Sequence, residues 1–299
     1  MKKLFLLFAA ASLLCGCNAS DDLNDADANT IVEIPDTKFK AYMVKNFDMN
    51  GDGEISEAEA ARIEIIAIPY TYENRGDIES LKGVEYCTAL TYLWCAYNRL
   101  SDLDVSRCPN LQELHCGFNR LTDLDVSGCT NLQELWCNVN SLTRLDLTQC
   151  PDLQILYCNH QYGLIDLDVN QCRNLRQLFC HRNQLTSLDV TKCPNLQMLD
   201  CNSNRLTNLD VSQCPNLYSL SCYDNQLSDL DVTMCSDLDD LRCYGNQLVS
   251  LDVSGCKEYI LLNTYLRPMP SLQTLYATFA QQQFFNKDHV PDTTDIIYR

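Results

Sequence analysis

Apolar positions recur along most of the chain with a period of 21 residues. The repeated unit is L-x-x-L-x-C-x-x-N-x-L-x-x-L-D-V-S-x-C-x-x, and LQELWCNVNSLTRLDLTQCPD from Leu132 is one example. A unit of this length buries its apolar face only against its neighbours, so the pattern predicts one solenoid in place of separate domains. The eight copies start at Leu90, Leu111, Leu132, Leu153, Leu175, Leu196, Leu217 and Leu238.

Polar and apolar side chains alternate around position 4 of the unit, which predicts a short strand in every repeat. Leucine at position 4 and cysteine at position 6 then face inward, while positions 3, 5 and 7 face outward. The copy at Leu153 has 22 residues, with the extra residue near Gln161-Tyr162-Gly163. Beyond the repeats we predict one more strand at Leu272 to Ala277 and an edge or capping strand in the final TTDIIYR.

Seventeen cysteines fall into two ladders, one at position 6 and one at position 19 of the unit. Stacked side chains point in parallel and an odd number cannot all pair, which disfavours a disulfide framework. Spacings of 8 and 13 residues do not match the C-x2-C clusters of metal sites, and a buried thiol lacks the base and exposure of a catalytic one. We therefore predict that cysteine acts here as a small apolar residue that fills a narrow core.

Two polar columns accompany the ladders. Asparagine at position 9 can bond the backbone of adjacent turns, although the copy at Leu153 has Gln161 there. Aspartate at position 15 would form a column of like charge, which persists most simply if each carboxylate accepts backbone N–H groups in its own turn. A weak cation ladder is the alternative. The aspartates are Asp104, Asp125, Asp146, Asp168, Asp189, Asp210, Asp231 and Asp252.

A calcium-binding loop is predicted before the repeats, in FDMNGDGEISEAEA. Counting from Asp48, oxygen ligands occupy positions 1, 3, 5, 9 and 12, position 7 offers its backbone carbonyl, and Gly53 permits the sharp turn at position 6. This is a complete EF-hand loop pattern. The predicted ligands of the single structural calcium are Asp48, Asn50, Asp52, Glu54, Ser56 and Glu59.

The loop lies between two predicted helices. Phe39, Met43 and Phe47 recur at helical spacing before it, and Ala61 and Ile65 continue that spacing after it. EF-hands usually work in pairs, and the sequence contains no second loop. We therefore expect residues 33–76 to form a cap on the open end of the solenoid; a regulatory switch and a loop that binds nothing are the alternatives.

The N-terminus predicts export. Lys2 and Lys3 precede an apolar run that is too short to cross a bilayer as a helix, which is typical of a signal peptide. Leu14-Cys15-Gly16-Cys17 resembles a bacterial lipobox, so residues 1–16 are the predicted signal peptide and Cys17 the lipid anchor; an ordinary signal without lipid is the alternative. Residues 17–32 form an acidic tether, in which Ser20-Asp21-Asp22 resembles the export signal of some Gram-negative surface lipoproteins.

The repeat unit resembles the cysteine-bearing repeats of internalin-type bacterial surface proteins, a group with leucine-rich repeats. The resemblance implies an α/β solenoid of horseshoe or arc shape, with a parallel concave sheet, an irregular convex side and a small helical EF-hand-like cap. It also implies binding or adhesion as the function. The predicted repeats span residues 77–277, and residues 278–299 form a C-terminal cap or tail. The lipobox departs from the wall-anchored members of that group.

Rings at position 5 form an outward stripe on five consecutive repeats. Solvent-facing strands normally carry polar residues, so a row of exposed rings predicts a binding surface. A protein ligand is the first interpretation, with carbohydrate capture, self-association or a spacer without a ligand as alternatives. The predicted ligand-binding residues, at positions 3, 5 and 8, are Tyr92, Trp94, Tyr97, His115, Phe118, Trp136, Tyr157 and Phe179.

The net charge of the chain limits the classes of partner that it can bind. The formal net charge is −18, and loss of Lys2 and Lys3 with the signal peptide makes it −20, which disfavours nucleic acid and anionic membrane surfaces. Membrane attachment is therefore expected only through the lipid. His115, His160 and His181 are spread over several repeats without a nucleophile or metal-ligand spacing, so no enzyme is predicted. The expected location is the outer membrane of a Gram-negative cell, exposed at its surface.

Overall fold

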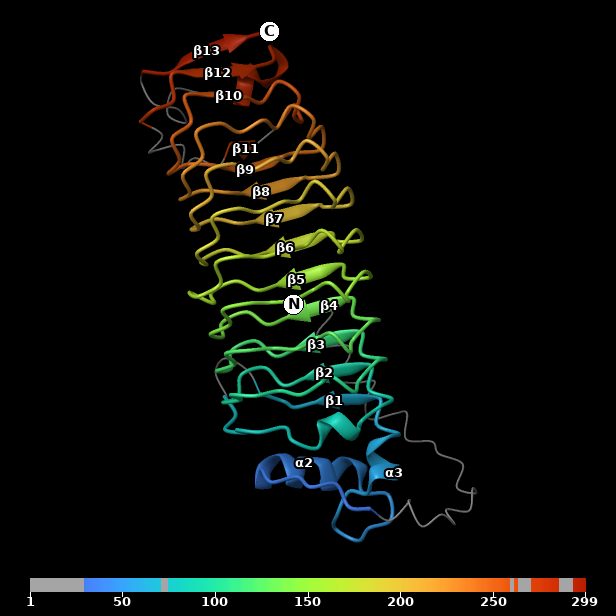
Figure 1. Ribbon diagram of the computed structural model, residues 1–299. Coiled ribbons are helices and arrows are strands. Elements are labelled where there is room, and N and C mark those ends of the chain that lie inside the picture. Colours follow the sequence, from blue (N-terminus) through green and yellow to red (C-terminus); the bar gives the residue numbers. More distant parts are fainter. Residues whose placement is uncertain (1–29, 71–74, 259–260, 263–269, 285–292) are drawn as a thin grey trace.

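The computed structural model describes residues 30–70, 75–258, 261–262, 270–284 and 293–299. Its repeats stack as successive turns of one solenoid, and ten short parallel strands form a continuous sheet along it (Figure 1). The predicted parallel-strand solenoid is therefore confirmed. In sheet order the strands are β1 (Ile65–Ala67), β2 (Tyr92–Trp94), β3 (Glu113–His115), β4 (Glu134–Trp136), β5 (Ile155–Tyr157), β6 (Gln177–Phe179), β7 (Met198–Asp200), β8 (Ser219–Ser221), β9 (Asp240–Arg242) and β11 (Leu261–Leu262).

From β2 to β9, each strand covers positions 3 to 5 of its repeat, and equivalent residues stand side by side. Leu135 of β4 pairs with Leu114 of β3 and Leu156 of β5, and all three are fully buried. The cysteine two residues later, such as Cys137, is also fully buried. The predicted inward register of positions 4 and 6 is therefore confirmed.

The seventeen ladder cysteines are all free thiols, and only Cys256 is more than marginally accessible. In most members of the second ladder the thiol points at a backbone carbonyl of the preceding repeat, as from Cys129 Sγ to Val105 O at 3.4 Å. Burial raises the pKa of Cys129 and of Cys137 to about 12. Their burial and their raised pKa agree with the prediction that these cysteines fill the core as small apolar side chains.

The two polar columns hold the turns as predicted. Asn140 Nδ2 donates to Cys116 O at 3.1 Å and to Cys137 O at 2.9 Å, while its Oδ1 accepts from Leu121 N at 3.0 Å. Asp146 Oδ1 accepts from both the backbone N–H and the hydroxyl of Thr148, which lowers the pKa of Asp146. Each amide thus joins two consecutive turns, whereas each carboxylate closes its own turn.

The N-terminal end of the solenoid is covered by α2 (Thr37–Phe47), which buries Phe39 and Met43 (Figure 1). The helix begins where it does because Asp36 accepts hydrogen bonds from Lys38 N and Phe39 N. The short 3-10 helix η2 (Val84–Tyr86) lies in the half-repeat before the first full copy.

The second helix of the cap is much shorter than its spacing predicts. α3 (Glu57–Ala60) has four residues, and the expected helical continuation through Ile65 is wrong. The chain turns after Ala60 and enters β1, where Ile66 pairs with Leu93 and is fully buried. A parallel strand partner and a buried site for Ile66 outweigh continuation of the helix.

The C-terminal end has a small second sheet, in the order β10 (Ser250–Asp252), β12 (Thr274–Ala277) and β13 (Asp295–Tyr298). The strand predicted at Leu272 to Ala277 forms, but it pairs with positions 13 to 15 of the last repeat because β11 already pairs with β9. The predicted capping strand is confirmed as β13, parallel to β12. The 3-10 helix η3 (Ala280–Phe284) follows β12.

Candidate functional site

Five rings stack along the outer face of the sheet, at position 5 of consecutive strands from β2 to β6. Their centroids are separated by 5.0 Å (Trp94 to His115), 4.9 Å (His115 to Trp136), 4.2 Å (Trp136 to Tyr157) and 4.3 Å (Tyr157 to Phe179). Interplanar angles are between 10° and 25°. We call this series the ring stack.

The stack follows directly from the register of the strands. Parallel neighbours lie about 4.8 Å apart, close to the contact distance of two aromatic planes. Side chains of the same position therefore meet face to face, each ring covering the next. The expectation of freely exposed rings is corrected here: the four aromatic rings are half-buried and His115 is only 5% exposed. What the stack offers to solvent is mainly ring edges.

Three other predicted residues lie beside the stack. Tyr92, at position 3 of β2, has its ring 5.5 Å from that of His115. Tyr97 and Phe118, at position 8 just beyond β2 and β3, stack at 4.4 Å and both adopt a positive φ. Left-handed backbone is uncommon for such residues and turns the chain sharply after the strand. The eight predicted ligand-binding residues thus lie on β2 to β6 or just beyond β2 and β3, in the N-terminal half of the sheet.

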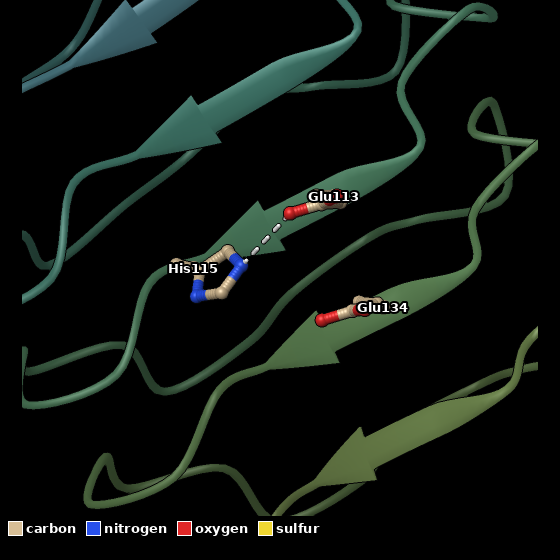
Figure 2. Close-up of side chains that lie close together, drawn as sticks. All are labelled: Glu113, His115 and Glu134. Atoms are coloured by element: carbon tan, nitrogen blue, oxygen red, sulfur yellow. Dashed lines mark ion pairs between the residues drawn. The ribbon is translucent and has the colours of Figure 1, made fainter. Parts of the chain in front are cut away.

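Two carboxylates that were not among the predicted site residues occupy position 3 next to the stack. Glu113 and Glu134 lie in register on β3 and β4, beside His115 (Figure 2). Burial, followed by the charge of Glu113, raises the pKa of Glu134, while Trp136 Nε1 donates to Glu134 Oε2 at 3.3 Å. The signal was present in the sequence, since ELH and ELW place an acid two residues before a ring on consecutive repeats.

The outer face becomes polar toward the C-terminal strands. Position 5 is occupied by Asp200, Ser221 and Arg242 on β7 to β9. Asp200 Oδ2 lies 3.2 Å from His181 Nδ1, and Arg242 Nη2 lies 3.1 Å from Asp240 Oδ2. The face therefore has an aromatic half and a charged half.

The predicted calcium loop has the hydrogen bonds of an ordered turn. Asp48 accepts from Gly51 N and Gly53 N, and Asp52 Oδ1 accepts from Glu54 N. Glu59 is buried and accepts from Met49 N at 2.9 Å and Ser56 N at 2.9 Å. In addition, the Lys40 ammonium lies 2.6 Å from the Glu54 carboxylate, whose residue contributes only a backbone carbonyl to the predicted site.

The oxygen donors of this loop fit a hard cation in kind. The carboxylates of Asp48, Asp52 and Glu59 do not meet within 4.8 Å of one another. Among the described residues, the one group of three His, Cys, Asp or Glu ligand atoms that does so lies on the sheet. Cys17 lies outside the described residues, as does the signal segment. Among the described helices, none is long and apolar enough to span a membrane.

Comparison with known proteins agrees with the fold. A family model described as leucine-rich repeats in two copies matches residues 88–128, 173–213 and 194–233. The chain is a leucine-rich repeat protein with internalin-like, cysteine-ladder repeats. Solenoids of this class are typically binding scaffolds without catalytic activity. No curated protein sequence matches the chain.

Among solved structures, the chain is similar to the functional domain of InlJ from Listeria monocytogenes, which includes a cysteine ladder. The identity is 31%, the match covers 82% of this chain and 55% of that one, and the TM-score is 0.59. A leucine-rich repeat protein of Leptospira interrogans matches at 23% identity over 74% of this chain and 57% of its own, with a TM-score of 0.55. The chain therefore spans little more than half the length of these relatives.

The PEPR1–AtPEP1 structure shares the fold at 23% identity, with 74% of this chain and 34% of that one covered and a TM-score of 0.56. Proteins with internalin-like leucine-rich repeats mediate protein–protein recognition.

Proposed function

We propose that the chain binds another protein through the aromatic half of the sheet. The observation that carries this proposal is the ring stack, which places four half-buried aromatic side chains in one row on the outer face of the sheet. Binding energy in protein interfaces concentrates in a few aromatic anchors that become fully desolvated. A row held rigid by mutual stacking also loses little side-chain entropy when a partner covers it.

The same geometry favours a protein over a carbohydrate. A sugar that packs on an aromatic residue needs a free ring face, since its C–H groups are attracted to the negative face of the ring. His115, Trp136 and Tyr157 each have a ring neighbour on both sides, at 5.0 Å or less. The exposed edges suit the irregular apolar and polar groups of a protein surface.

Truncation of the middle of the stack tests the proposal. The mature protein and its variants would be applied to a protein array and to a glycan array. Trp136→Ala should weaken binding to a protein ligand by about 2 kcal/mol or more. Tyr162→Ala is the matched control, because Tyr162 is 63% exposed and lies near the one-residue insertion of the fourth repeat, outside the stack. Glycan capture lost in the Trp136 variant would favour the carbohydrate function, and capture of neither class would favour a spacer.

We also propose that Cys17 carries a lipid that anchors the protein to the outer membrane, with the solenoid exposed at the cell surface. The support is the Leu14-Cys15-Gly16-Cys17 segment after an apolar run. Cys17→Ala should abolish incorporation of radiolabelled fatty acid and release the protein from the membrane fraction. Cys15→Ala is the control and should keep both label and attachment. Continued labelling of the Cys17→Ala variant would show that the lipid is attached to another residue.

A structural calcium ion in the cap is the third part of the proposal. Its support is the oxygen donor set of the loop, ordered by its own backbone hydrogen bonds. A cation that binds only the folded chain raises stability by about 2.7 kcal/mol at a concentration one hundred times its Kd. Calcium should therefore raise the Tm, and a chelator should reverse the increase.

The choice of variant for the calcium test is constrained by Glu59. This residue closes a capping box with Ser56, so Glu59→Ala would destabilise α3 even without calcium. Asp52→Asn removes a ligand charge while leaving an oxygen to accept from Glu54 N, and it should abolish most of the calcium-dependent increase in Tm. Equal calcium responses of wild type and Asp52→Asn would place the ion elsewhere or make it irrelevant.

A further inference from the structure

We propose that Glu113, His115 and Glu134 form a binding site for a divalent transition-metal ion of the Zn²⁺ type on the outer face of the sheet (Figure 2). The site lies between β3 and β4, far along the chain from the predicted calcium loop. It does not depend on the proposed protein partner, because the three ligands come from this chain alone.

The spacing of the ligand atoms suits such an ion. One nitrogen of His115 and one oxygen from each glutamate all lie within 4.8 Å of one another. His115 Nε2 is 3.6 Å from Glu113 Oε2. Zinc–ligand bonds of about 2.0 to 2.2 Å in a tetrahedron separate two ligands by roughly 3.4 Å, so this pair already stands near the required distance. Small rotations of the glutamate side chains would bring the third ligand into place.

The buried imidazole supplies an observation independent of the two carboxylates. The side chain of His115 is only 7% exposed, since its ring faces are covered by Trp94 and Trp136. Its Nε2 is buried and has no hydrogen-bond partner, although it is directed toward Glu113. A buried polar atom without a partner costs free energy, and a metal ion would satisfy it.

The charges point to the same conclusion. Glu113 and Glu134 are directly opposite in the parallel register, and like charges in that arrangement destabilise a sheet. In the described part of the chain, no Lys or Arg side chain forms an ion pair with either carboxylate. A divalent ion would neutralise both.

The ligand set also selects the metal. Calcium and magnesium prefer oxygen ligands only, whereas an imidazole with carboxylates suits Zn²⁺ and its neighbours in the first transition row. The indole N–H of Trp136 holds Glu134 by donating to its Oε2. Hydrogen bonds of this kind orient a ligand and affect metal affinity by about 10- to 100-fold.

The chain contains its own reporters for a test. Its only two tryptophans, Trp94 and Trp136, stack on His115 from either side. The mature protein would be titrated with Zn²⁺ by calorimetry and with Co²⁺ by tryptophan fluorescence, in the presence of calcium to occupy the cap. We expect one equivalent of Zn²⁺ to bind and Co²⁺ to quench the fluorescence with the same stoichiometry.

Variants decide the outcome. Glu113→Gln and His115→Gln should each weaken Zn²⁺ binding by about tenfold or more, and Glu134→Gln should do so while keeping an oxygen near Trp136. His160→Gln is the matched control and should change nothing. The glutamate variants preserve the ring stack, so they remain informative if His115→Gln folds poorly. Absence of saturable binding at a large molar excess, or unchanged binding in both glutamate variants, would overturn the proposal.

Discussion

Asn140→Ala is expected to lower the free energy of unfolding by about 2 to 4 kcal/mol. Its amide makes three bonds to the backbone of two consecutive turns. Cys116 O and Cys137 O would each keep a second amide, from Asn119 and Gln161, but Leu121 N–H would lose the partner that the structure gives it. A buried unpaired donor costs about 1 to 3 kcal/mol and each lost hydrogen bond about 0.5 to 1.5 kcal/mol. Urea unfolding followed by circular dichroism measures the change.

Asn131→Ala is the control for this substitution. Asn131 also donates to the backbone of the previous repeat, to Pro109 O at 3.0 Å, but it is exposed. Water can replace its bond, so we expect a loss below about 1 kcal/mol. Similar losses at the two positions would contradict the view that the buried asparagines hold the turns together.

Leu135→Ala should lower the free energy of unfolding by about 2 to 5 kcal/mol, because it opens a cavity in the core of the solenoid. Leu135 is fully buried, between Leu114 and Leu156 of the neighbouring strands. These neighbours are fixed by strand pairing on both sides and have little freedom to collapse into the space. Thermal and urea unfolding of the variant would measure the loss.

The adjacent residue provides the contrast. A freely exposed ring at position 5 would contribute nothing to stability, and Trp136→Ala would then leave the free energy of unfolding unchanged. Because Trp136 stacks on a ring at either side, we expect a loss of about 1 to 3 kcal/mol instead, at about 0.5 to 1.5 kcal/mol for each stacked pair. Its larger effect should fall on ligand capture, whereas Leu135→Ala in its folded state should still bind. If Leu135→Ala abolished capture and left stability intact, the inward and outward assignments of the strand would be reversed.

The repeat made most of the fold predictable. A fixed period places equivalent residues side by side, so burial of Leu135, the free thiol of Cys137 and the bonds of Asn140 follow from one copy of the unit. Segments that deviate from the 21-residue period were harder to predict. Ile65 fits a helical spacing, yet it lies in β1 because an open strand edge was available to it, and such an edge is a property of the assembled sheet.

The sequence predicted which rings belong to the candidate site but not how they are arranged. The rings at position 5 were identified from outward register alone, which does not reveal that they cover one another's faces. Glu113 and Glu134 were not predicted as site residues, because acidic residues are common on solvent-facing strands. Their importance depends on the buried imidazole of His115 beside them. Both effects depend on distances across strands, which a single repeat does not contain.

The free state of the ladder thiols has a mechanical consequence. With no disulfide between the ladder cysteines, neighbouring turns of a solenoid pulled from its two ends are held against each other only by non-covalent contacts, and each turn can detach separately. Releasing one turn of 21 residues adds roughly 70 to 75 Å of extended chain. Extension under load would therefore proceed in nearly equal steps. Each released turn would lower the tension on the turns that remain folded.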